Sequence, residues 1–273
     1  DDDAAAAAAA AVVRNKQEGE SDTYSLLRVV PTLSIPSWTE IKPLIVASSS
    51  VFLRTFVLQL GLSGAAAMAA RGGIGDADDG GAAASVAAHQ IALQLWLLCS
   101  FVCDALAAAS QALIADSLGR KDTLAVRDVS KVVLWYTLLL GVVLAALLTV
   151  GDATGFLLGI FTKDLDTKAA LSPLLVVLIA TQPLNALVFT ADGLLQGASE
   201  FTYQAKSMVL SVGVAVASFI AIESMDGYPK DTLLHVWEAL AVLQLVRLIT
   251  SFVKILDTDG PIDLLGTEEV TPT

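Results

Sequence analysis

The stretch "AAHQIALQLWLLCSFVCDALAAASQALIADSLGRKD", residues 87–122, decides the class of this protein. It is apolar over more than the roughly 20 residues that a helix needs to cross a bilayer, and it ends in a basic loop at Arg120 and Lys121. Asp104 interrupts it with a carboxylate that has no cation close to it in the sequence. Because an ionised group at membrane depth is costly unless a partner, water or a proton compensates it, Asp104 is a candidate functional residue.

The whole chain has the same character. Its 273 residues are 55% hydrophobic and 16% charged, whereas soluble domains carry about 25% charged residues. The formal net charge of −12 concentrates in loops and at the two ends, and no basic face is present, which disfavours a nucleic-acid partner. The composition predicts an integral, multi-pass membrane protein. It does not distinguish the plasma membrane, the vacuolar membrane and the plastid envelope.

Six apolar segments are each long enough to span a bilayer as a helix. They cover about residues 42–70, 85–117, 129–150, 169–197, 203–223 and 232–256. We therefore expect an all-α polytopic membrane protein with three parts: a disordered connector over 1–38, a six-helix transmembrane lobe over 39–257 and a polar C-terminal tail over 258–273. Most lysines and arginines outside the spans fall on the side of the two chain ends, so both ends are expected in the cytoplasm or stroma. The stretch Gly155–Phe161 is too short to span and is expected at the interface.

Two segments carry polar stripes at helical spacing. The stripe of the second segment follows Gln90, Gln94, Leu97, Phe101, Asp104, Ala108 and Gln111, and that of the fourth follows Gln182, Asn185, Phe189, Asp192 and Gln196. Each stripe contains one carboxylate. Such residues usually face a bundle interior or a water cavity and mark an ion or substrate path. The alternative is that both stripes only join helices by hydrogen bonds.

Two further residues stand out inside the spans. Arg54 lies in the middle of the first span and needs an anionic partner, which is Asp104, Asp192 or a bound anionic substrate. Pro183 removes a backbone donor in the fourth span and crowds the carbonyl of Ile179, which predicts a helix kink.

Cys99 and Cys103 are one turn apart, but no histidine or further cysteine completes a metal site. We therefore expect no metal there.

The quoted stretch resembles the second-half signature of the multidrug and toxic compound extrusion (MATE) transporters, closest to the DinF-like and plant citrate-effluxer (Detoxification) branch. The stretches "VFLRTFVLQLG" (51–61), "FTKD" (161–164) and "ATQPLNALVFTADGLLQGASEFTYQA" (180–205) match this branch in order and spacing. Family members have twelve helices in two six-helix lobes. The resemblance implies that this chain is the C-terminal lobe, and we expect the N-terminal six-helix lobe to be a missing partner. It departs from the common pattern in having Ala105 after Asp104, and Gln111 where many bacterial relatives have a glutamate.

The resemblance implies a secondary active efflux transporter, an antiporter that exports an organic solute by alternating access and is driven by a proton or sodium gradient. Carried onto this chain, Asp104 and Asp192 are the candidate ion-coupling carboxylates, and Gln111, Gln182 and Asn185 are their polar neighbours. The resemblance implies no enzyme activity and no cofactor beyond the coupling ion. Its substrates include citrate, phenolic acids and cationic xenobiotics, and Arg54 favours organic anions among them.

Two other classes of function are compatible with two aspartates on membrane helices. One is an intramembrane aspartyl protease, whose aspartates can share a proton, but the contexts "VCDA" and "TADG" do not resemble its motifs. The other is a membrane scaffold that does not transport, such as a truncated paralogue. Its polar stripes would only hold helices together.

Overall fold

The computed structural model describes residues 37–72, 79–225 and 231–266, and every regular element within them is a helix. The chain divides into two units, residues 1–41 and 42–273, and the lobe discussed below is the second. The connector predicted over 1–38 lies outside the described residues except at its last two positions. Residues 267–273 of the predicted tail also lie outside them.

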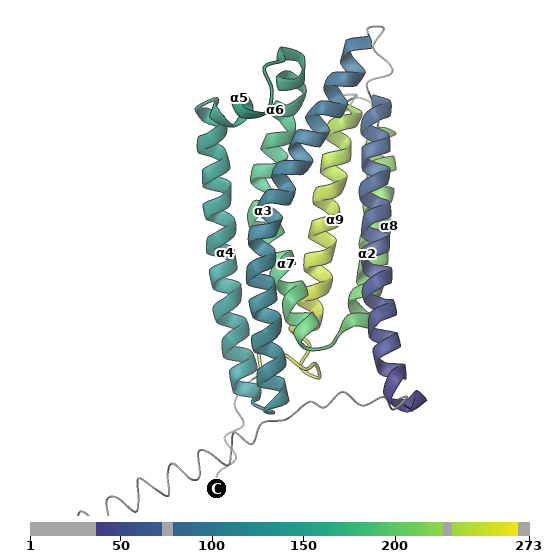
Figure 1. Ribbon diagram of the computed structural model, residues 1–273, viewed down its shortest axis with the longest axis vertical. Helices are drawn as coiled ribbons and strands as arrows, with labels where there is room; N and C mark the ends of the chain where they lie inside the picture. The colour runs from purple at the N-terminus through teal and green to yellow at the C-terminus, as the bar shows by residue number, and fades with distance from the viewer. Residues whose placement is uncertain (1–36, 73–78, 226–230, 267–273) are drawn as a thin grey trace, which may run out of the picture. The chain divides into compact units, whose positions relative to one another are not determined.

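The described residues form an all-helical lobe with five single helices and one bent helix pair that are apolar and long enough to cross a membrane. The helices are α2 (Trp38–Gly72), α3 (Asp79–Gly119), α4 (Thr123–Ala153), α5 (Phe156–Phe161), α6 (Leu165–Ala180), α7 (Gln182–Gly197), α8 (Phe201–Glu223) and α9 (Thr232–Ile255) (Figure 1). Five of them, α2, α3, α4, α8 and α9, are long and apolar enough to span a membrane alone. The sixth crossing is the pair α6 and α7, which passes the same test together and is bent by 52° at Thr181.

The helix ends extend beyond the predicted apolar segments because polar residues cap them. The side chain of Asp122 accepts a hydrogen bond from the Ala125 amide at 3.0 Å, so α4 begins at Thr123 rather than near 129. Asp164 accepts from the Thr167 amide at 2.8 Å and from its hydroxyl at 2.6 Å, and α6 begins at once after it. These bonds satisfy backbone donors that a helix start leaves open. They also hold the pKa of Asp164 below its ordinary value, the Thr167 hydroxyl being the largest cause.

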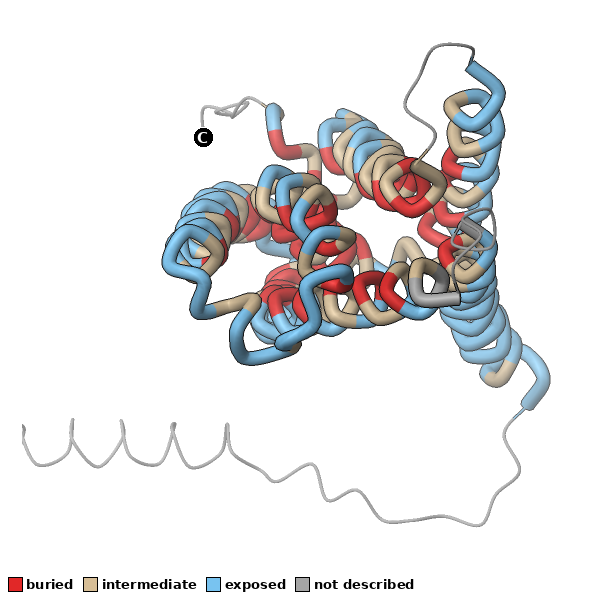
Figure 2. Tube along the Cα trace, turned by 90° about the horizontal axis from the view of Figure 1, so that it is seen from above, coloured by how far each residue is buried: buried red, intermediate tan, exposed pale blue. Residues whose placement is uncertain are grey.

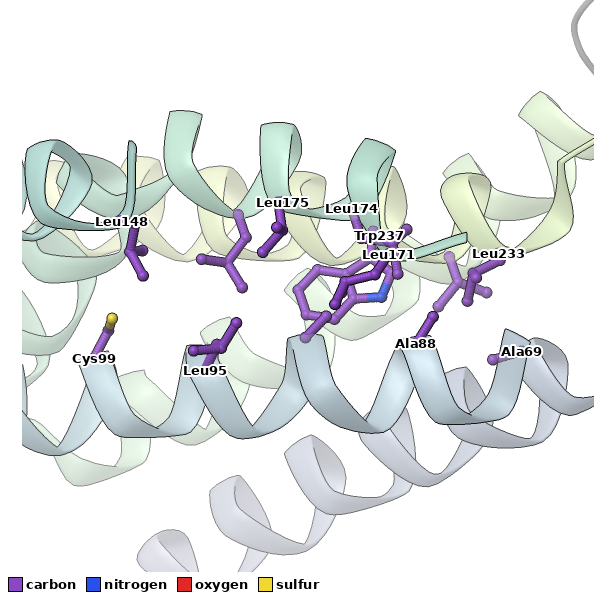
Figure 3. Packing of buried hydrophobic residues seen from close by; sticks show 13 residues of the cluster. Ala69, Ala88, Leu95, Cys99, Leu148, Leu171, Leu174, Leu175, Leu233 and Trp237 are labelled. Carbon is purple, nitrogen blue, oxygen red and sulfur yellow. The ribbon is translucent and has the colours of Figure 1, made fainter. Parts of the chain in front are cut away.

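Two apolar clusters hold the helices together. The larger one joins α2, α3, α4, α6 and α9 around Leu95, Leu174 and Trp237 (Figure 3). The second lies at the other end of the helices and joins α3, α4, α7 and α9 around Ile114 and Leu194. Seen along the helices, buried residues turn toward neighbouring helices and exposed residues turn outward (Figure 2). Large apolar side chains such as those of Trp135 and Leu147 lie on the outward faces, as expected where lipid replaces water.

The first part of the predicted polar tail is folded onto the lobe. Ile262 and Leu264 are buried within the second cluster. Arg127 of α4 donates from Nε to the carbonyl of Asp263 at 2.9 Å and forms an ion pair with its carboxylate. This segment differs from the predicted tail because its two apolar residues alternate with the polar ones and find an apolar surface at the ends of α3, α4 and α7.

Helices α3 and α7 pack against each other along much of their length, and two glycines allow the close approach. A Cβ atom on Gly193 would lie 2.4 Å from the carbonyl oxygen of Ala107, and one on Gly197 would lie 2.6 Å from that of Gln111. Small residues four apart are a common way for membrane helices to bring their backbones together. Because Asp192 directly precedes Gly193, this contact fixes the depth and direction of its carboxylate.

Candidate functional site

A buried ion cluster centres on Asp192 of α7. Its carboxylate forms an ion pair with Arg54 of α2 and a second one with Arg247 of α9 at 2.5 Å. Gln204 of α8 donates to the Asp192 carbonyl at 2.8 Å and to its Oδ1 at 3.4 Å. Four helices therefore meet at one carboxylate, which is 6% exposed as a residue.

A hydrogen-bonded chain continues from this cluster into the lobe. Arg247 donates from Nη1 to Gln244 Oε1 at 2.6 Å, and Gln244 donates to Asn185 Oδ1 at 2.6 Å. Asn185 donates to the hydroxyl of Ser100 on α3 at 3.3 Å. The ring of Phe189 lies against the guanidinium of Arg247, 5.9 Å from its carbon. Three polar residues of the α7 stripe, Gln182, Asn185 and Asp192, are thus buried, and the hydrogen-bonded chain joins α3, α7 and α9.

The cluster holds more positive than negative charge. Two guanidinium groups share one carboxylate, and the Nε atoms of both arginines are buried without a hydrogen-bond partner among the described residues. Asp104 interacts electrostatically with Arg54 and Arg247 but makes no hydrogen bond or ion pair that the described part of the lobe reveals. Asp104 is therefore the nearby carboxylate that can balance the second cation without being bonded to it.

Arg247 and Gln244 were not recognised in the sequence. Arg247 is as isolated within the apolar segment 232–256 as Arg54 is within 42–70, so the same test of a single cation at mid-span would have found it. Its depth supports this: it lies eight residues before the end of α9, about 12 Å along the helix. Ser100 carries no comparable signal, because a serine in an apolar helix usually bonds its own backbone.

Asp104 lies on an outward face of the lobe, which differs from the expectation of a carboxylate inside the bundle. The residues of its stripe that are exposed include Gln90, Gln94, Phe101 and Ala108. The reason lies on the opposite face of α3, where small and apolar residues such as Ala92, Cys99 and Cys103 are buried against neighbouring helices. Since that face packs more closely, the polar stripe points away from the lobe.

The remaining candidate residues lie in different surroundings. Gln182 is fully buried, and neither polar atom of its side chain has a partner among the described residues. Gln111 is half-buried where α3 meets Gly197. Pro183 stands in the first turn of α7, directly after the bend, where its missing amide hydrogen leaves no helical bond unmade.

The cysteines do not form a site together with other ligands. Cys99 and Cys103 are 5% and 0% exposed, and both are free thiols. In the described residues, no group of three or more His, Cys, Asp or Glu side chains lies close enough to hold a metal ion.

Comparison with known proteins places these helices in a family. The model of the MatE family matches residues 81–222, which is just over half of the 273 residues. The chain belongs to the MatE family. The match runs from the start of α3 to the end of α8 and so includes Asp104 and Asp192.

Curated relatives and a solved structure agree with this assignment. Protein DETOXIFICATION 45, chloroplastic, of Arabidopsis thaliana is 33% identical over 208 residues, which are 76% of this chain and 34% of the relative. Protein DETOXIFICATION 42 of the same plant is 34% identical over 65% of this chain and 33% of its own length. A multidrug resistance MATE family transporter, solved in an outward-facing conformation, superposes with a TM-score of 0.63 at 19% identity and covers 84% of this chain and 49% of its own. The chain thus spans about a third of the length of these relatives and about half of that structure.

Proposed function

We propose that this chain is one lobe of a secondary active efflux transporter that exports an organic solute in exchange for protons or sodium ions. The solute binds between this lobe and a second lobe of similar size, and alternating access carries it across the membrane. Membership of the MatE family supports the transporter class. The share of the DETOXIFICATION relatives that the chain covers leaves room for such a second lobe.

The exposed stripe on α3 carries this proposal. An aspartate at the centre of a lipid-facing helix costs about 3 kcal/mol on insertion scales, and Asp104 stands 15 residues before the end of α3, about 22 Å from it. A stripe with Asp104, Gln90 and Gln94 on an outward face is therefore unsuited to lipid and suited to a water-filled space or a protein partner. The second lobe provides both.

In this account the two aspartates have different roles. Asp192 is already bonded to two arginines and a glutamine, so it anchors α2 and α9 to α7. Asp104 has electrostatic contact with the same arginines but no bond to them, and it is open to the space between the lobes. Asp104 therefore takes up and releases the coupling ion. When no ion is bound, the charges of Arg54 and Arg247 stabilise the ionised carboxylate of Asp104.

The surplus positive charge also favours an organic anion as the substrate. Arg54 is the outer of the two arginines, with its side chain 20% exposed, whereas that of Arg247 is 4% exposed. A carboxylate of the substrate near Arg54 would balance the second cation while Asp104 is protonated. Citrate and salicylate are suitable probes, with a cationic dye as the contrasting one.

Efflux from vesicles that contain the complete protein tests the proposal. After loading with citrate, salicylate or the dye, an imposed pH step or sodium step should accelerate the loss of at least one probe relative to vesicles without protein. The faster response to one of the two steps identifies the coupling ion. A protein that is correctly inserted yet releases none of the probes after either step would contradict transport and favour a scaffold.

A further inference from the structure

We propose that the lobe binds one phospholipid in a groove between α2, α8 and α9, with the acyl chain in the groove and the headgroup phosphate at Arg71. This inference does not depend on the transport proposal. It rests on the shape, the length and the charge of a surface whose lining contains neither Asp192 nor the two arginines that pair with it.

The groove is lined mainly by apolar side chains. It has a volume of about 650 Å³, and its lining includes Leu60, Gly64 and Met68 of α2, Val216 and Phe219 of α8, and Leu243 of α9. Helix α2 passes in front of α8 in Figure 1, and the two approach closely at Gly61, where a Cβ atom would lie 3.5 Å from Val212. At Gly64, which lines the groove, a Cβ atom would have no heavy atom within 4 Å. The lining offers no buried charge that would require a polar occupant.

The length of the groove matches one leaflet of a bilayer. From Leu60 to Arg71, α2 rises about 16 Å at about 1.5 Å per residue. The hydrocarbon core of a bilayer is about 30 Å thick, so one leaflet takes up about 15 Å of it. A single acyl chain lying along the groove would therefore end with its headgroup near the last turn of α2.

Arg71 supplies a charge at that position. It lines the groove in the last turn of α2, is exposed, and forms no ion pair with any residue that the structure describes. A guanidinium group binds phosphate oxygens well. Apolar lining along one leaflet and a single cation at the surface fit a phospholipid, with preference for one of net negative charge.

Native mass spectrometry of the complete protein, incubated with equal amounts of phosphatidylglycerol and phosphatidylcholine of the same acyl chains, tests this site. We expect one phospholipid to remain bound, with phosphatidylglycerol favoured. Gly64→Trp should fill the groove and remove the bound lipid. The matched control is Gly213→Trp on α8, which is also exposed with nothing within 4 Å of its Cβ but does not line the groove, and it should keep the lipid.

The charge is tested separately by a variant that leaves the groove open. Arg71→Gln should reduce the preference for phosphatidylglycerol about fivefold, the effect expected of one basic residue near a membrane surface. Lys163→Gln, which removes an exposed cation from the loop before α6, should leave the preference unchanged. Equal lipid retention in the Gly64→Trp and Gly213→Trp proteins would overturn the proposal. So would a change in oligomeric mass specific to Gly64→Trp, because it would show that a second copy occupies the groove.

Discussion

At the scale of single residues, the buried cluster depends on Asp192 more than on either of its two arginines. Asp192 is shared by two arginines from α2 and α9 and receives a further hydrogen bond from Gln204. In a buried cluster, removing one partner costs more than the pair contributes, since the remaining charge keeps its desolvation penalty. Asp192 is thus the residue on which the cluster depends, and each arginine is partly replaceable by the other.

Substitutions within this cluster should follow that order. Asp192→Asn leaves Arg54 and Arg247 facing each other without a carboxylate, and we expect it to lower the free energy of unfolding by about 3–5 kcal/mol. Arg247→Gln should cost less, because Arg54 still pairs with Asp192, and Arg54→Gln should cost least because its side chain is 20% exposed. Thermal unfolding of the purified variants in detergent measures the order. A larger loss for Arg54→Gln than for Asp192→Asn would contradict it.

At the scale of elements, the site depends on how α7 is held. The bend of 52° between α6 and α7 and the close contact of Gly193 with Ala107 set the position of Asp192 relative to α3. Pro183 lies in the first turn after the bend, where the sequence predicts a kink. The contact at Gly193 is invisible in the sequence alone, because a glycine in a membrane helix does not reveal which helix it touches.

A methyl group at Gly193 should therefore be poorly tolerated. In Gly193→Ala the added carbon must push the backbone of Ala107 away, and overpacking of this kind costs about 1–3 kcal/mol. Gly213→Ala is the matched control on α8, since its Cβ meets nothing within 4 Å and alanine favours the helix by about 1 kcal/mol. Melting temperatures should fall for the first variant and hold or rise for the second. Equal behaviour of the two would mean that α3 and α7 are not in close contact at Gly193.

The sequence predicted the elements well and the site in part. Runs of apolar residues identify each span because a helix needs about 20 of them to cross the bilayer. The length of such a run can be read from the sequence without knowing which helices pack against it. The stripes on α3 and α7 were found from their spacing alone. The spacing did not predict which of the two stripes is buried, because burial depends on which face of each helix packs against its neighbours. Helix α3 presents alanines and cysteines to its neighbours, whereas α7 presents its polar residues to Arg247 and Ser100.

At the scale of the whole molecule, six crossings would place successive loops on alternate sides of the membrane. Helix α4 is a single span between Lys121 and Lys163, both of which are exposed. An impermeant thiol reagent should label Lys121→Cys from the cytoplasmic or stromal side and Lys163→Cys from the opposite side. The native thiols of Cys99 and Cys103 should stay unlabelled because they are buried. Labelling of both engineered cysteines from one side would refute six crossings.

Asp104, on the face turned away from this lobe, is the residue that we propose couples solute efflux to an ion gradient. Gradient-driven efflux by Asp104→Asn in the complete protein, compared at matched expression with Asp116→Asn, tests this role. Asp116 is the control because it lies three turns further along α3, exposed, and pairs with Arg120 at the helix end. We expect Asp104→Asn to bind the solute but to release it no faster than protein-free vesicles do, while Asp116→Asn remains active. Full gradient-driven efflux in Asp104→Asn would contradict this role, because asparagine has nearly the size of aspartate but cannot take up or release a proton or pair with a cation.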